Sequence, residues 1–185
     1  MESAKHKVLS EREKVNQKFR HVSLEMETST HFPMLMRAVQ ETQGTILELG
    51  SGIFSTPLLH WLCFKDKRSL ITVENYKHYL EFAKKFETDW HKVEYVDPFE
   101  QSVVAGVFGV VFVDHSPKKP RTRGDDALLY KDSAQIIVLH DAGLNPYEKY
   151  GYLPIYKEFK YVSHWEGCLP HTTVLSNFID VTKWN

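Results

Sequence analysis

One stretch constrains the fold of this chain most: Gly44-Thr-Ile-Leu-Glu-Leu-Gly-Ser-Gly-Ile-Phe-Ser-Thr-Pro57, an apolar run that breaks into a glycine turn. The run at 46–49 predicts a short buried parallel strand, with Glu48 near its end. Gly50 and Gly52 allow a sharp turn and a close approach of a ligand to the main chain. Ser55, Thr56 and Pro57 are typical of a helix start. The stretch therefore predicts strand, turn and helix, with a ligand at the turn.

A second acidic strand end supports a nucleotide-like ligand. The apolar residues 69–73 predict another strand, which ends in Glu74, about twenty residues after the glycines. A carboxylate at that point can accept hydrogen bonds from ribose hydroxyls. A merely structural strand, turn and helix is the alternative for the glycines alone, and Glu74 favours the ligand.

These motifs resemble those of the class I S-adenosylmethionine (SAM)-dependent methyltransferases. The first family motif, acidic-x-Gly-x-Gly, is matched by Glu48-Leu49-Gly50-Ser51-Gly52. NAD-binding proteins have a third glycine where this chain has Ser55, which disfavours a dinucleotide. The resemblance covers about residues 30–181. It implies a Rossmann-like α/β fold: a doubly wound, mostly parallel seven-stranded sheet with an antiparallel last strand and helices on both faces.

The resemblance also implies the cofactor, SAM, and its product S-adenosylhomocysteine (SAH). Glu48 would position the methionyl part, Glu74 would hold the ribose, and Asp97, after the strand predicted at 93–96, would lie near the adenine. The full set of residues expected to bind the cofactor is Glu48, Gly50, Ser51, Gly52, Ser55, Thr56, Glu74, Asp97 and Asp114.

Length and charge fit one such domain. The chain has 185 residues and a formal net charge of -1, which gives no general electrostatic attraction to nucleic acid. No apolar run approaches the roughly 20 residues of a membrane helix, and the N-terminus has no signal-peptide core. We therefore expect a cytoplasmic protein, with Cys63 and Cys168 as reduced thiols. A homodimer is left open.

The first 28 residues differ from the rest of the chain, because they are charged and carry no strand pattern. Apolar residues recur there at helical spacing, which predicts an amphipathic helical extension, followed by a single domain over 29–185. Its basic residues could cap a substrate or simply face solvent. Ser29 and Thr30 are expected to cap the next helix, which runs to Gly44.

Two further strand ends carry polar side chains. The strand predicted at 110–113 runs into Asp114 and His115, and the strand at 135–139 runs into His140 and Asp141. Parallel strands deliver these four residues to one edge of the sheet, beside the transferable methyl group. We interpret them as catalytic. The alternative is that the aspartates cap helices and the histidines lie on the surface.

This edge resembles that of the catechol-type O-methyltransferases, in which residues after the same two strands surround magnesium. The resemblance implies Mg²⁺ on Asp114 and Asp141, where it would lower the pKa of a hydroxyl group. Ala142 stands where that family has a ligand asparagine, and Lys118 falls one place late. Without a metal, His115, His140 or Asp114 would serve as the general base.

The residues together predict a SAM-dependent methyltransferase that acts on a small-molecule acceptor, more often at oxygen than at nitrogen. A basic loop with Lys118, Lys119, Arg121 and Arg123 suits an acidic or hydroxylated acceptor, or is a solvated loop. Two alternatives stay open: a protein that binds SAM without catalysis, and a metal-dependent hydrolase that uses the aspartates and histidines.

Overall fold

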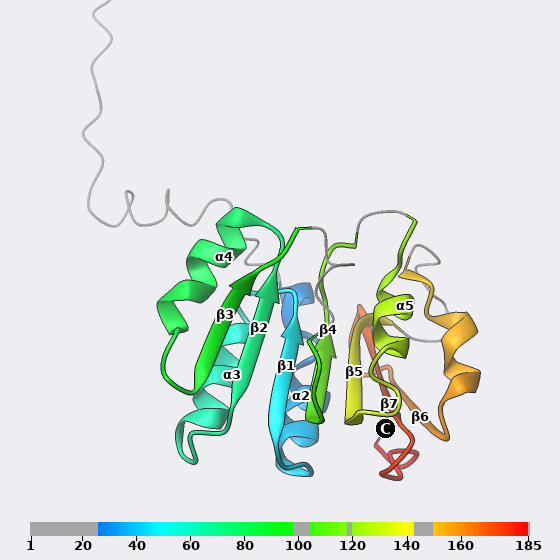
Figure 1. The fold of residues 1–185 in the computed structure, drawn as a ribbon. Coiled ribbons are helices and arrows are strands. Elements are labelled where there is room, and N and C mark those ends of the chain that lie inside the picture. The colour runs from blue at the N-terminus through cyan, green and yellow to red at the C-terminus, as the bar shows by residue number, and fades with distance from the viewer. Residues whose placement is uncertain (1–25, 98–103, 118–119, 143–149, 185) are drawn as a thin grey trace, which may run out of the picture.

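Seven strands form one sheet, in the order β3-β2-β1-β4-β5-β7-β6, in the computed structural model of the chain (Figure 1). The structure describes residues 26–97, 104–117, 120–142 and 150–184. Neighbours from β3 to β5 pair in parallel, and β7 is antiparallel to both β5 and β6. The strands are β1 (Thr45–Leu49), β2 (Leu70–Glu74), β3 (His91–Tyr95), β4 (Phe108–Val113), β5 (Ala134–Ala142), β6 (Tyr161–Trp165) and β7 (His171–Ser176). The predicted fold class is thus confirmed.

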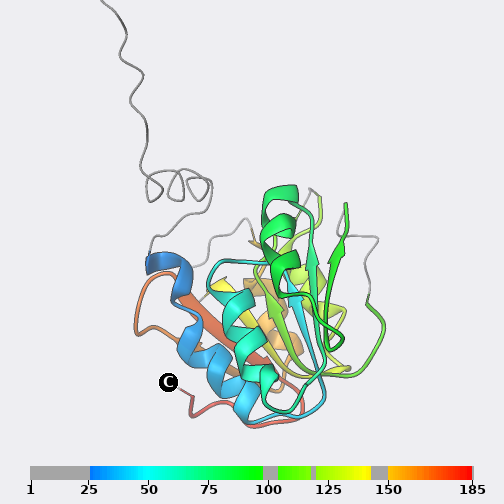
Figure 2. The same ribbon diagram turned by 90° about the vertical axis from the view of Figure 1, so that its left-hand side faces the viewer.

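Helices cover both faces of the sheet. On one face, α2 (Phe32–Gln40) and α3 (Ser55–Phe64) lie side by side (Figure 2). On the other, α5 (Arg123–Leu128) and the 3-10 segment η5 (Leu153–Glu158) pack on the sheet. Near the β3 edge of the sheet, α4 (Lys77–Ala83) contacts β2 and β3. The remaining 3-10 segments are η1 (Met26–Ser29) and η2 (Lys84–Phe86).

Alternation along the central strands divides the core into two layers. Ile46 and Val110 pack with the α2 and α3 residues, whereas Leu47 and Val111 pack with residues of α5 and η5. All six residues of β4 are buried. Both faces are covered, so the central strands are continuous apolar runs, as expected for a parallel sheet.

The register brings the strand ends level. Leu49 lies beside Val73 on one side and Val113 on the other, and Val113 lies beside Leu139. The residues that follow these four positions therefore meet at one edge of the sheet, where parallel α/β folds bind ligands.

Two local predictions were wrong. The helix after Thr30 begins at Phe32 with His31 as its N-cap residue, and the His31 side chain makes no capping hydrogen bond. The Thr30 hydroxyl donates instead to the Pro170 carbonyl (2.7 Å). Strand β5 continues to Ala142 because β7 pairs with it there, so His140 and Asp141 belong to the strand, with a register shift between Leu139 and Ala142.

Other predictions fall outside the described residues. These are residues 1–25 of the helical extension predicted over 1–28, and Lys118 and Lys119 of the predicted basic loop. Every helix in the part of the chain that the structure describes is too short or too polar to cross a bilayer.

Candidate functional site

A cavity of about 190 Å³ opens at the C-terminal edge of β1, β2 and β4. The loop after β1 contributes Gly50 to Ser55, and β2 ends at the cavity with Glu74. The whole lining is Thr28, His31, Gly50, Ser51, Gly52, Ile53, Phe54, Ser55, Glu74, Tyr76, Tyr79, Asp114, His115 and Ser116. Six of the nine residues expected to bind the cofactor line this cavity; Glu48, Thr56 and Asp97 do not.

Glu74 ties two loops together at the cavity wall. One carboxylate oxygen accepts hydrogen bonds from the backbone and hydroxyl of Ser51, both at 2.8 Å. The other accepts from the backbone N–H groups of Asn75 (2.7 Å) and Tyr76 (2.6 Å). The backbone donors are fixed, but the Ser51 hydroxyl can rotate. A hydroxyl group of a ligand can therefore replace it on Glu74.

Gly50 is required by the neighbouring backbone and not only by a ligand. Its φ is +89°, and a Cβ there would lie 2.5 Å from the Cα of His115. A backbone hydrogen bond from Asp114 N–H to Leu49 O (2.8 Å) holds this close approach, and Gly50 N–H is bonded on the other side to Val73 O of β2 (2.9 Å). The glycine thus lets the loops after β1 and β4 come together at the cavity.

Glu48 lies behind the cavity, fully buried. Its carboxylate accepts hydrogen bonds from the hydroxyls of Thr72 (2.6 Å) and Thr56 (3.0 Å). The Thr56 hydroxyl in turn accepts from Gly52 N–H (3.1 Å). Glu48 therefore shapes the glycine turn through Thr56, without facing a ligand itself.

The same carboxylate ends a directed chain of hydrogen bonds. Since the Thr72 hydroxyl donates to Glu48, its oxygen accepts from Nε2 of His91 (2.9 Å). His91 is then protonated at Nε2, so its Nδ1 accepts from Nδ1 of His60 (3.1 Å). Burial lowers the pKa of His91 to about 4, which keeps this ring neutral. Burial also raises the pKa of Glu48 to about 7.

This raised pKa predicts a pH-dependent stability. The contribution of Glu48 to the free energy of unfolding is fully present below pH 4.5, the ordinary pKa of the group. It is lost as the pH rises to about 7. Between pH 5 and pH 7.5, the free energy of unfolding of the wild type, measured with urea, is expected to fall by about 2 kcal/mol. Glu48→Gln should not show this fall. Glu94→Gln, exposed on β3, should keep the wild-type loss. An equal loss in Glu48→Gln would contradict the assignment.

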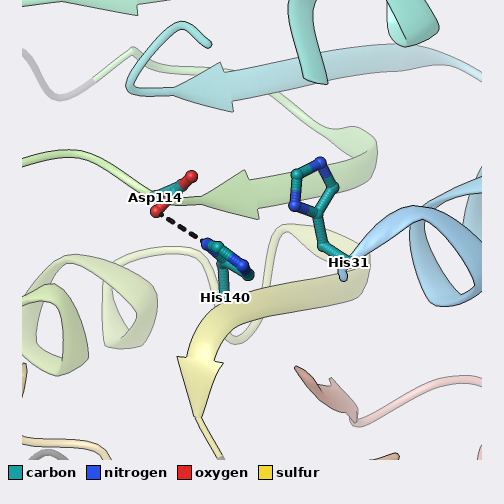
Figure 3. A group of neighbouring side chains, drawn as sticks. All are labelled: His31, Asp114 and His140. Atoms are coloured by element: carbon teal, nitrogen blue, oxygen red, sulfur yellow. Dashed lines mark ion pairs between the residues drawn. The ribbon is translucent and has the colours of Figure 1, made fainter. Parts of the chain in front are cut away.

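Three of the four predicted catalytic residues meet at the edge of β4 and β5. His140 Nδ1 lies 3.2 Å from Asp114 Oδ1, the pair drawn in Figure 3, and 3.8 Å from Asp141 Oδ1. His115 lies apart from them: its Nε2 is 2.6 Å from Asp126 Oδ2, and the ring is buried. His115 therefore joins the loop after β4 to α5.

Arg123 is the cation of this site. Its guanidinium lies 3.0 Å from Asp114 Oδ1 and 3.1 Å from Asp141 Oδ2. It also donates to the carbonyls of His115 (2.5 Å) and Asp114 (3.0 Å), and it stacks 4.0 Å from the Tyr150 ring. The side chain is buried, so the prediction of Arg123 as part of a solvated or substrate-facing loop was wrong.

These contacts do not fit the magnesium site that the resemblance implied. The guanidinium already bridges the two carboxylates expected to bind the ion, and Ala142 offers no side-chain ligand. A divalent cation between Asp114 and Asp141 would have to displace a buried charge that also donates to backbone carbonyls and stacks on the Tyr150 ring. The residues present therefore do not fit a magnesium ion.

The charges at this site fix its protonation. Burial alone would raise the pKa of Asp114, but the charges of His140 and Arg123 outweigh it and hold that pKa well below its usual range. His140 is the reciprocal case: burial lowers its pKa, and the carboxylate of Asp114 raises it above the ordinary value.

The hydrogen bonds of Thr30 support a protonated His140. Because the Thr30 hydroxyl donates its proton to Pro170, its oxygen accepts from Nε2 of His140 (3.2 Å). The other ring nitrogen faces two carboxylates, which favour a second proton. His140 is then an imidazolium paired with Asp114.

His31, which belongs to no motif and was not predicted, completes the site. It precedes α2 and lies against the rings of Phe112 (4.8 Å) and His140 (4.8 Å). The side chain lines the cavity with 1% of its surface exposed. Burial, and then the charge of His140, lower its pKa to about 3.

Asp97 lies just past the C-terminal end of β3, exposed and off the cavity, with Tyr95 Oη at 3.4 Å. Its predicted contact with adenine stays a prediction.

Comparisons with known proteins support the fold. No family model matches the chain, and no curated sequence is significantly similar to it. A protein from Staphylococcus aureus assigned as a caffeoyl-CoA O-methyltransferase has a similar structure, with a TM-score of 0.62 at 14% identity over 91% of this chain and 93% of that one.

Two other solved structures are similar at the same identity. TomG, an O-methyltransferase of tomaymycin synthesis from Streptomyces achromogenes solved with SAM, has a TM-score of 0.58 at 14% identity over 91% of both chains. A delta-N METTL16 methyltransferase domain has a TM-score of 0.53 at 14% identity, over 91% of this chain and 96% of that one. The chain therefore has the fold of the class I SAM-dependent methyltransferases.

Proposed function

We propose that this protein is a SAM-dependent methyltransferase that transfers the methyl group to a hydroxyl of a small-molecule acceptor. One observation carries the proposal: the glycine turn, Glu74 and Asp114 line a single cavity at the C-terminal edge of the parallel strands. Two structural neighbours are named O-methyltransferases, and one of them was solved with SAM.

The cavity residues suit the parts of the cofactor. Glu74 would accept hydrogen bonds from the ribose hydroxyls, with the Ser51 hydroxyl giving way. The loop of Gly50 to Ser55 leads into the N-terminus of α3, whose backbone N–H groups attract an anion such as the methionyl carboxylate. Glu48 and Thr56 would hold this loop from behind.

The acceptor would lie between the loop after β1 and Asp114. The chemistry that SAM supplies when bound is a methyl group already activated on a sulfonium sulfur. The protein then has to orient the acceptor oxygen and take its proton. Asp114, held from behind by His140 and Arg123, would form a fixed charged wall for that oxygen, and the buried Arg123 would take the place of a metal as the local cation.

Titration calorimetry with SAM and SAH tests the cofactor assignment. We expect micromolar binding by the wild type, weakened about 10- to 100-fold by Glu74→Gln, because hydrogen bonds to a charged group contribute about 1.5–3 kcal/mol. The control is Glu81→Gln, exposed on α4, which should bind like the wild type.

Turnover is tested by SAH formation with catechol, 4-hydroxybenzoate and glucuronate, with magnesium and with EDTA. We expect turnover of at least one of these acceptors and the same rate in both conditions. Binding without turnover would favour a SAM-binding protein without catalysis. Absence of binding would overturn the methyltransferase proposal and favour the hydrolase alternative.

A further inference from the structure

Among the polar groups at the cavity, His31 stands out because its hydrogen-bonding capacity is unused. Neither ring nitrogen has a hydrogen-bond partner within the described residues, although the side chain is almost completely buried. A buried imidazole without partners is unfavourable, since it has lost its hydrogen bonds to water and gained none in the protein. Because buried polar groups are normally hydrogen-bonded, such a group in a cavity wall indicates a ligand that forms the hydrogen bond.

The other candidate bases at the site are already committed. Asp114 pairs with His140 and Arg123, and Asp141 pairs with Arg123. His140 donates a hydrogen bond from Nε2 to the Thr30 hydroxyl, and its Nδ1 faces the carboxylate of Asp114. His115 is paired with Asp126 through Nε2.

We propose that His31 is the proton acceptor of the methyl transfer, a role that rests on the proposed function. A ring nitrogen of His31 accepts the hydrogen bond of the acceptor hydroxyl and so orients the oxygen toward the methyl group. The titratable groups that face the ring are His140 of β5 and Asp114 at the end of β4. Figure 3 shows the three side chains together, with His31 coming from the start of α2.

The transfer balances with His31 in this role. A bond forms between the methyl carbon and the acceptor oxygen, and the sulfur–methyl bond breaks with its electron pair left on sulfur. The hydroxyl proton passes to the imidazole. The positive charge of the sulfonium is thereby replaced by the charge of an imidazolium, which Asp114 attracts. The proton then leaves to solvent when the products leave the cavity.

The low pKa of His31 is compatible with this role. It keeps the ring neutral near pH 7, so the lone pair is available. The acceptor oxygen becomes a strong acid as it gains the methyl group, so a weakly basic imidazole suffices late in the transfer.

The test compares wild type, His31→Gln and His31→Phe for SAM affinity by calorimetry, and for kcat between pH 6.5 and 9 on the acceptors catechol, 4-hydroxybenzoate and glucuronate. His31→Phe keeps an aromatic ring against Phe112 if the glutamine variant fails to fold. The control is His164→Gln, a half-buried histidine on β6 outside the cavity.

We expect both His31 variants to bind SAM within about twofold of wild type and to lose about 100- to 10,000-fold in kcat. With the phenolic acceptors, catechol and 4-hydroxybenzoate, the lost rate should return as the pH rises, because the acceptor oxyanion then needs no base, whereas wild type and His164→Gln should stay nearly flat. With glucuronate, whose alcohol groups stay protonated at pH 9, the rate should not return. A purely structural role would not produce this pH rescue.

Three results would overturn the inference. One is a His31 variant with wild-type kcat, and another is a reduced kcat with the wild-type pH profile. The third is activity lost on EDTA treatment and restored by Zn²⁺, which would assign His31, Asp114 and His140 to a metal. A wild type that binds SAM but methylates none of the acceptors would instead remove the proposed function, and this inference with it.

Discussion

Arg123→Met is expected to lower the free energy of unfolding by about 3–5 kcal/mol at pH 7, because removing one partner of a buried ion pair leaves uncompensated charge. Two carboxylates, of Asp114 and Asp141, lose their cation together. The carbonyls of His115 and Asp114 lose a donor as well. Methionine keeps much of the volume, so the loss reports charge and hydrogen bonds. Urea unfolding measures it.

The pH dependence of this loss identifies its cause. The low pKa of Asp114 contributes stability that is present above pH 3.8, the ordinary pKa of the group, and is lost as the pH falls through the folded-state pKa. Removing Arg123 takes away one of the two main charges that lower this pKa and leaves that of His140, so the contribution becomes smaller. The gap in the free energy of unfolding between wild type and Arg123→Met should therefore be full at pH 7, nearly full at pH 4, and should close as the pH falls below 3.8.

Two variants serve as comparisons. Arg123→Lys keeps a charge but lacks the planar fork that reaches both carboxylates, and it should fall between wild type and Arg123→Met. Arg121→Met removes a cation from Asp126, which keeps its contact with His115, and should cost about 1 kcal/mol. A loss in Arg123→Met that does not change with pH would contradict the charged bridge.

Gly50→Ala is expected to destabilise the protein by about 3 kcal/mol or more. The left-handed backbone costs a residue with a Cβ about 1–2 kcal/mol. The new Cβ would also lie 2.5 Å from the His115 Cα and 2.8 Å from the Asp114 carbonyl carbon, and overpacking of this kind costs typically about 1–3 kcal/mol. Backbone atoms cannot rotate away, so β1 and β4 must separate.

The midpoint of thermal unfolding measures this change. A loss of 3 kcal/mol lowers it by about 10 °C in a chain of this length. Gly52→Ala is the matched control, since its Cβ would meet only the Ser55 hydroxyl, at 3.1 Å, and its φ is not in the left-handed region. A Gly50→Ala protein as stable as Gly52→Ala would show that the close approach after β1 and β4 is not needed.

The cavity wall was largely predictable from the sequence. Gly50 to Gly52 follow a short apolar run and Glu74 ends another, both typical of buried strands, and parallel strands bring their ends to one edge. The same logic brought Asp114, His140 and Asp141 together. This logic could not show that His115 lies apart from the other three residues. His115 turns toward Asp126 of α5, and the direction of a side chain cannot be read from the strand ends.

Two residues show where prediction from the sequence stopped. Arg123 belongs to a basic stretch of sequence whose composition is typical of a solvated loop. In the structure it is the first residue of α5, and the position of this helix directs it inward between two carboxylates. His31 is one of 10 histidines and belongs to no motif. It reaches the cavity because α2 packs across β4 and β5. This packing brings His31 against His140, which is more than a hundred residues later in the chain.

The sequence by itself determined the order and type of the strands and the position of the glycine turn, since apolar periodicity and backbone freedom are local properties. The tertiary structure alone decided which charges are neutralised, and by what. Protonation of Asp114, His140 and His31 depends on burial and on partners from four separate elements, and these distances exist only after the sheet and its helices have packed.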